Sequence, residues 1–176
     1  MSAHPFPATS PSYEHASDGP PASFAAAHVR RTGSIHLGGD PERVFPFFTP
    51  EGERRWVPGW DPVHRHPADG ALQAGGVFVT RAPGEDETVW LVVRYDPAAL
   101  DVAYARVTPG VRAGVVEVRC RAALGGGTLA HVAYTLTALS PRGNEVLGTF
   151  TEERYAAMLG DWEAAVNRCL AEDAGG

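Results

Sequence analysis

The stretch that decides the fold is GVVEVRCRAALGGGTLAHVAYTLTAL, residues 114–139. Its two halves alternate apolar and polar residues, which is typical of strands with one buried face. The triple glycine of residues 125–127 stands between them, and a connection this short joins strands only in antiparallel pairs. Placing Leu124 opposite Thr128 predicts one apolar face and one polar face. The apolar face then pairs Cys120 with Val132, Val118 with Tyr134 and Val116 with Leu136, and the polar face pairs Glu117 with Thr135, Arg119 with Ala133 and Arg121 with His131.

A long C-terminal helix is the predicted cover for that apolar face. From about residue 144 to residue 171, apolar residues recur at helical spacing and form one stripe. Charged residues lie mostly on the opposite side of the same helix. The stripe consists of Phe150, Tyr155, Met158, Leu159, Trp162, Val166 and Cys169.

Upstream of the hairpin, the sequence predicts a first strand at residues 31–37 and two short helices. Asp40-Pro41 begins the first helix, because Asp accepts hydrogen bonds from the free backbone donors and Pro fits the first turn. Thr49-Pro50 repeats this signal and predicts a second helix over residues 50–55. A loop over residues 56–60 follows, with a brief strand at 63–67.

Longer strands are predicted at residues 76–81, 88–95 and 100–107, and the short turns between them indicate antiparallel pairing. Closing the first turn with Val79 opposite Val89 sets Phe78 across from Trp90, an aromatic pair that stabilises a sheet. In the next turn, Tyr95 opposite Leu100 sets Arg94 opposite Asp101 as a surface ion pair, and Arg106 falls on the side of Leu91 and Tyr104.

These elements predict an α+β fold, in which a curved antiparallel sheet of about six to seven strands wraps around one long C-terminal helix. Two short helices follow the first strand. Residues 1–28 are rich in Pro, Ser and Ala without a hydrophobic period, so we expect a disordered tail there. Residues 29–172 form the single domain, and residues 173–176 a flexible end. A helix laid across a strongly bent sheet leaves space beneath it, so we expect an internal cavity.

Composition excludes several classes of function. The 176 residues include 15 basic and 21 acidic ones, a net charge of −6, which argues against nucleic acid as a partner. No run of 18 apolar residues exists, so we expect no membrane insertion, and without a signal-peptide pattern we expect a cytoplasmic protein. The two cysteines, Cys120 and Cys169, are too few for a disulfide framework or a zinc site.

Four motifs resemble those of the START-like superfamily, also called SRPBCC or Bet v 1-like, which includes polyketide cyclase/dehydratase relatives. The resemblance extends from Val29 to about Ala171 and implies a helix-grip fold with a ligand cavity between the terminal helix and the sheet. The motifs are DPERVF at residues 40–45, ERRWVPGW at 53–60, TVWLVVRYDP at 88–97 and GTLAHVAY at 127–134.

The resemblance leaves two main functions open. One is a module that binds a hydrophobic or aromatic small molecule. The other is a cyclase or dehydratase enzyme that uses acid/base residues in the same cavity, without a metal or nucleotide cofactor. A third is a protein-interaction role like that of chaperone-associated members. An enzyme should hold a strongly perturbed titratable group inside the cavity, whereas a carrier needs only hydroxyls. We expect a monomer or a homodimer.

Other motifs for catalysis or metal binding are weak. His64 and His66 lie on one side of a predicted strand, but Asp69 is the only acid close behind them and His131 lies on the polar side of the last hairpin. We therefore interpret them as surface histidines and expect no metal site. Nucleophile elbows and phosphate-binding glycine loops are missing too. Cys120 stands on the apolar face and is interpreted as a small buried hydrophobe.

Glu53 is the candidate catalytic residue. It stands three residues before Trp56, so both lie on one helical face at the entrance that the fold implies. It would act as a general base or a polar anchor. The alternatives are a solvated charge or an ion pair with Arg54 or with an arginine of a strand. We expect the ligand to be bound by Trp56, Trp60, Phe78, Trp90, Tyr104, Arg106, Val118, Tyr134, Leu136, Met158 and Trp162.

Overall fold

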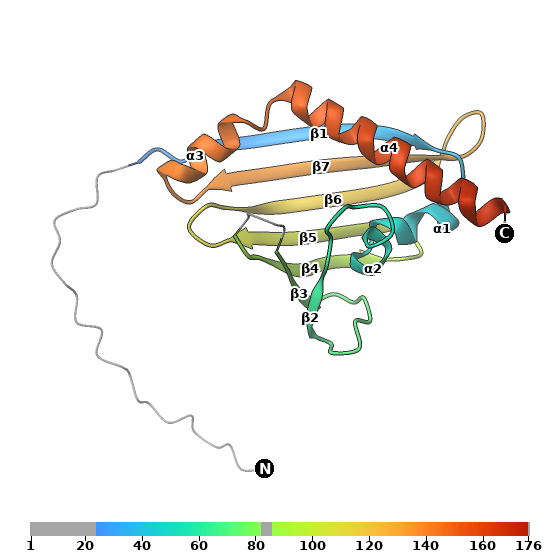
Figure 1. Cartoon of the computed structure of the whole chain (residues 1–176), viewed down its shortest axis with the longest axis horizontal. Coiled ribbons are helices and arrows are strands. Elements are labelled where there is room, and N and C mark those ends of the chain that lie inside the picture. The colour runs from blue at the N-terminus through green and yellow to red at the C-terminus, as the bar shows by residue number, and fades with distance from the viewer. Residues whose placement is uncertain (1–23, 82–85, 176) are drawn as a thin grey trace, which may run out of the picture.

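The computed structural model describes residues 24–81 and 86–175. Within these ranges the chain forms one seven-stranded antiparallel sheet in the order β1-β7-β6-β5-β4-β3-β2, so the first strand closes against the last (Figure 1). The helix-grip α+β architecture predicted from the sequence is confirmed. The strands are β1 (His28–Leu37), β2 (Val63–His66), β3 (Val77–Thr80), β4 (Thr88–Asp96), β5 (Asp101–Thr108), β6 (Arg112–Ala122) and β7 (Thr128–Ala138).

Short helices connect β1 to β2, and a pair of helices ends the chain. The first group comprises α1 (Pro41–Val44), the 3-10 helix η1 (Phe45–Phe48) and α2 (Pro50–Glu53); the second comprises α3 (Pro141–Gly148) and α4 (Glu152–Gly175). In Figure 1, α4 runs along β1 on one side of the sheet, while α1 and α2 lie over the strands further across. None of the helices within the described ranges has the length and apolar run needed to cross a bilayer.

The β6–β7 hairpin has the predicted faces but a different register. Ala122 lies opposite Thr128, which places Val116 opposite Tyr134 and shifts every predicted pair by two residues. The turn is wider than expected because the three glycines all have positive φ angles, a conformation that costs other residues energy. A shift by an even number of residues leaves each side chain on its predicted face, so the apolar face is still the one that faces α4.

The other hairpins show one confirmed and one wrong register. Val79 pairs with Val89 and Phe78 with Trp90 as predicted, while the turn at residues 82–85 lies outside the described residues. Between β4 and β5, a bulge near Arg94 puts Tyr95 opposite Val102 rather than Leu100. The ion pair of Arg94 with Asp101 nevertheless forms, at 3.1 Å. Arg106 lies opposite Trp90 on the inner face, which it shares with Tyr104 as predicted. Leu91, predicted on the same side, is instead exposed on the outer face.

The single helix predicted over residues 144–171 is two helices. Ser140 caps α3 by accepting a hydrogen bond from the Gly143 amide, and the chain leaves the helix at residues 149–151. In α4 the helix continues to Gly175, and Asp173 pairs with Arg55 at 2.7 Å, so residues 173–175 lie within the helix. The missed signal was Ser140-Pro141, a cap followed by proline in the first turn.

The N-terminal boundary of the domain also lies earlier than predicted. Strand β1 begins at His28, and the amide of Ala27 donates a hydrogen bond of 2.7 Å to Asn144 on α3. The last residues of the segment predicted as a tail therefore belong to the domain. Residues 1–23, the rest of that segment, lie outside the described residues.

Helix α4 packs against β1 closely enough to cover both its face and its edge. Gly33 lies under Leu159, where a Cβ atom would come within 2.3 Å of the leucine methyl group. The Tyr155 hydroxyl reaches past β1 and donates to the Val132 carbonyl at 2.8 Å. Glu163 accepts a hydrogen bond from the His36 amide at the open edge of β1. An edge strand that is covered in this way is protected from pairing with other chains.

We expect Gly33→Ala to lower the free energy of unfolding by about 1 kcal/mol, because the added methyl group displaces the terminal methyl group of Leu159 from its packed position. Urea denaturation measures the change. Thr32→Ala is the matched control, since Thr32 is exposed on the other face of β1 and its loss should change stability by less than about 0.5 kcal/mol. Equal stabilities for the two variants would show that α4 does not press on β1 at this point.

Candidate functional site

A cavity of about 190 Å³ lies on the concave side of the sheet, between the strands that α4 leaves uncovered and the loop after α2. Strands β3 to β7 supply its floor, and α2, residues 57–60 and one side chain of α4 supply its roof. The structure brings most of the sequence-predicted site residues together around this space. They are Glu53, Trp60, Phe78, Trp90, Tyr104, Arg106, Val118, Tyr134 and Trp162.

Three of the expected residues lie elsewhere. Trp56 is buried behind Trp162, with the ring centroids 5.1 Å apart, and its indole donates to the Phe47 carbonyl. Leu136 is 1% exposed in the core, where it lies opposite Gly114 rather than Val116. Met158 lines a neighbouring hollow between α4 and the loop after α2, which shares Val57, Pro58 and Trp162 with the cavity.

Sequence reasoning missed several lining residues. Three of the missed residues lie two positions from a predicted lining residue on the same strand: Thr80 from Phe78, Thr88 from Trp90, and Val116 from Val118. Residues two apart in a strand share a face, so these three could have been predicted. Arg112 lies on the same face as Val116 and could have been predicted too. Asp86 belongs to the loop before β4, where no periodicity exists to predict it. The remaining lining residues are Pro50, Val57, Pro58 and Gly59.

Four aromatic side chains, which we call the aromatic wall, form one side of the cavity: Trp60, Phe78, Trp90 and Tyr104. The rings of Phe78 and Trp90 are stacked with their centroids 5.7 Å apart, and Trp60 meets Trp90 edge-on at the same distance. The indole nitrogens already have acceptors within the protein, because Trp60 donates to the Pro50 carbonyl and Trp90 to Thr80. What the aromatic wall offers to the cavity is therefore apolar ring surface.

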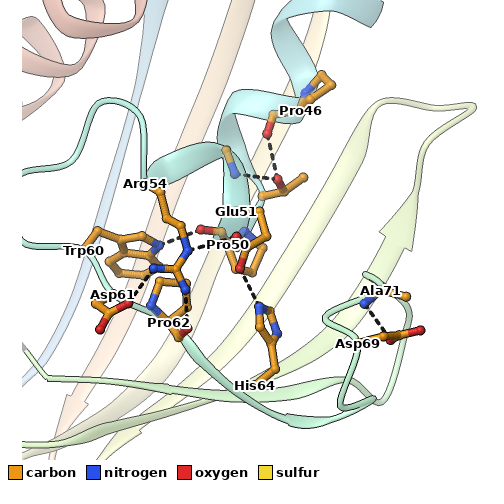
Figure 2. A network of polar contacts seen from close by, with 12 residues as sticks. Pro46, Pro50, Glu51, Arg54, Trp60, Asp61, Pro62, His64, Asp69 and Ala71 are labelled. Atoms are coloured by element: carbon orange, nitrogen blue, oxygen red, sulfur yellow. Dashed lines mark hydrogen bonds and ion pairs between the residues drawn. The ribbon is translucent and has the colours of Figure 1, made fainter.

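Polar contacts outside the cavity hold Trp60 in place (Figure 2). Arg54 donates to Glu51 at 2.9 Å, to the carboxylate of Asp61, and to the Pro62 carbonyl at 2.7 Å. His64 bonds to the second carboxylate oxygen of Glu51, and this hydrogen bond is the largest cause that lowers the pKa of Glu51. Single surface ion pairs contribute little stability, but this network joins α2 to residues 61–64, which directly follow Trp60.

Helix α2 directs Glu53 into the cavity. Thr49 caps this single turn by accepting from the Gly52 amide, and Pro50 occupies its first position. Pro50 and Glu53 are three residues apart, so they share a side of the turn, and both line the cavity. Glu51 and Arg54 face outward and pair with each other. The ion pair between Glu53 and Arg54 that we considered does not form.

Burial raises the pKa of Glu53 to about 8. Its accessible surface faces the cavity, and within the described residues no side chain bonds to its carboxyl group. Burial also raises the pKa of Tyr104 and of Tyr134, and the charge of Glu53 adds to both increases. Both tyrosines therefore stay protonated at neutral pH. The Tyr104 hydroxyl is already used, since it donates to the Phe48 carbonyl at 3.0 Å.

Charged groups gather where β5 and β6 meet the loop before β4. The guanidinium carbon of Arg106 lies 4.7 Å from the ring centroid of Trp90, a cation–π contact. Arg112 lines the cavity with a buried Nε atom that has no acceptor among the described residues. Asp86 also lines the cavity and pairs with Arg142 at 2.8 Å.

The other chemical candidates take structural roles. His64 packs against Phe78 and pairs with Glu51, and the described residues contain no group of three or more His, Cys, Asp or Glu side chains that suits a metal ion. Cys120 is 3% exposed, and burial raises its pKa to about 12, which keeps the thiol protonated and unreactive.

The raised pKa of Glu53 predicts a pH-dependent stability. Between about pH 4.5 and pH 8 the folded protein holds a proton that the unfolded chain releases, so the free energy of unfolding falls as pH rises through this window. The slope from one such group is at most about 1.4 kcal/mol per pH unit. We expect Glu53→Gln to remove this slope, and denaturation at several pH values measures it. Glu42→Gln, which replaces an exposed carboxylate of α1, should keep it. Parallel curves for the wild type and Glu53→Gln would contradict the burial of this carboxyl.

Solved structures with the same fold come from bacteria and plants. Norcoclaurine synthase from Thalictrum flavum superposes with a TM-score of 0.59 at 12% identity, covering 84% of this chain and 88% of that one. An uncharacterised protein from Rhizobium leguminosarum reaches 0.56 at 19% identity, covering 82% and 97%. A protein of unknown function from Staphylococcus aureus reaches 0.56 at 16% identity, covering 84% and 98%.

Identities this low establish the fold alone. A search of the curated proteins found no match. The model of one protein family matches residues 28–167, which include every strand and the lining residues of the cavity. The chain therefore belongs to the family described as polyketide cyclase / dehydrase and lipid transport.

Proposed function

We propose that the protein binds a small molecule with an aromatic or hydrophobic group in this cavity. The observation that carries the proposal is the aromatic wall, whose ring surfaces face one space and whose indole nitrogens are already hydrogen-bonded. An apolar cavity of about 150 Å³ holds benzene in an engineered protein. A cavity of about 190 Å³ therefore suits a ligand with a single ring and a short substituent.

A second function, acid–base catalysis, is supported by Glu53. A carrier gains nothing from an enclosed carboxyl to which no side chain of the described ranges bonds, because such a group costs stability. A carboxyl with a pKa of about 8 exchanges its proton readily near neutral pH, which is what a general acid or base requires. If the protein is a cyclase or dehydratase, the ionised carboxylate of Glu53 takes a proton from the carbon beside a substrate carbonyl. Tyr134, which stays protonated on the same cavity surface, would donate a hydrogen bond to the resulting enolate oxygen.

Binding is tested with phenylacetone, a neutral single-ring ketone, by calorimetric or ligand-detected NMR titration. We expect Trp60→Ala to weaken its binding at least tenfold, because the variant removes one face of the aromatic wall. Leu91→Ala is the matched control: Leu91 neighbours Trp90 in β4 but is 40% exposed on the outer face of the sheet. Equal affinities for the two variants would place the ligand outside the cavity.

Proton transfer is tested by the loss of the benzylic proton signal of phenylacetone in D2O. We expect the protein to accelerate this exchange and the rate to rise with pH and level off above about pH 8, as Glu53 becomes fully ionised. Glu53→Gln should lower the rate at least about 100-fold and keep binding within about tenfold. Glu51→Gln, on the outward side of the same turn, should keep the rate. An unchanged rate in Glu53→Gln would leave the protein as a binding module.

A further inference from the structure

The charged end of the cavity has a geometry that suits an anion. Arg106 on β5 lies opposite Gly114 on β6, and Arg112 stands two residues from Gly114 on the same inner face. The two guanidinium groups are thus diagonal neighbours across the strand pair, with no side chain between them at position 114. Both charges act on Tyr134: burial raises the pKa of this tyrosine, and each arginine lowers it by a smaller amount.

Among the described residues, the acids that line the cavity form no ion pair with Arg112. Asp86 is shared with Arg142, which pairs with it at 2.8 Å. Glu53 is largely protonated at neutral pH, because burial raises its pKa and neither Arg106 nor Arg112 is among the causes that shift it. Arg112 has a buried Nε atom without an acceptor among the described residues. A buried donor without a partner costs free energy, which a bound acceptor would recover.

The surroundings of Arg112 extend the same positive charge outward. A neighbouring hollow of about 270 Å³ shares Arg112 and Asp86 with the cavity, and Arg142 and Arg154 complete its charged lining. Three arginines against one aspartate give this hollow an excess of positive charge, which attracts ligands of the opposite sign and raises their local concentration. An anion would meet these exposed arginines before it reached Arg112.

We infer that the ligand is an aromatic carboxylate, with its ring against the aromatic wall and its carboxylate bound by Arg112 beside Arg106. This inference rests on the proposed binding function and adds the charge of the ligand. A carboxylate matches the planar fork of a guanidinium and accepts two hydrogen bonds from it. The aromatic wall and Arg106 meet at Trp90, so one single-ring molecule spans both ends of the site.

Phenylacetate and phenylacetone make a matched pair of probes, because they share the ring and methylene group and differ in charge. At pH 7 we expect phenylacetate to bind at least about tenfold more tightly, since hydrogen bonds to charged groups are the stronger ones. Arg112→Gln should weaken the binding of phenylacetate at least tenfold and change the affinity for phenylacetone by no more than about twofold. Arg121→Gln, an exposed arginine on the outer face of the same strand, should change neither affinity.

The comparison on the unmodified protein keeps the test valid even if a variant fails to fold. If phenylacetone binds as tightly as phenylacetate, the inference of an anionic ligand is wrong while the proposed binding function stands. If neither probe binds, the proposed function fails and the inference fails with it. A preference for phenylacetate that persists in Arg112→Gln would overturn the assignment to Arg112.

Discussion

The structure depends on one geometric constraint: a single helix is too narrow to cover the sheet. Seven strands at about 4.8 Å spacing span about 29 Å, whereas a helix with its side chains is about 10–12 Å wide. Helix α4 lies along β1, and Gly33 allows it to approach closely (Figure 1). The apolar face of the other strands must be covered by the segment between β1 and β2. That segment supplies short helices and a loop, and the space it leaves unfilled is the cavity.

The same constraint explains where polar residues break the pattern of the inner face. Glu53 and Arg112 both point toward the space between the layers, where a packed core would hold apolar side chains. The outer face shows how this protein treats arginines in structural roles. There Asp101 accepts hydrogen bonds from both Arg94 and Arg119, and Glu117 from Arg94. Sites where local rules are broken without such compensation are the places where function is expected.

Much of the fold was predictable from the sequence, because it depends on periodicities that tolerate error. An alternation of two residues fixed the inner face of β6 and β7 even though the predicted register was wrong by two. The break between α3 and α4 was missed because the apolar spacing continues through Phe150, which packs on Tyr134 and Tyr155 from outside either helix. Hydrophobic spacing predicts which residues are buried, but it does not predict where the backbone leaves the helix.

The sequence by itself determined the class of the fold, the inward strand faces and the presence of Glu53 and the indoles near one loop. Tertiary structure alone decided which of them meet. Trp56 and Trp60 flank the same Pro58-Gly59 turn, yet one indole is buried behind Trp162 and the other joins the aromatic wall. Likewise, Arg54 turns outward to Glu51 and Asp61, which leaves Glu53 to face the cavity. These choices depend on contacts between segments far apart in the chain, and local spacing contains no information about such contacts.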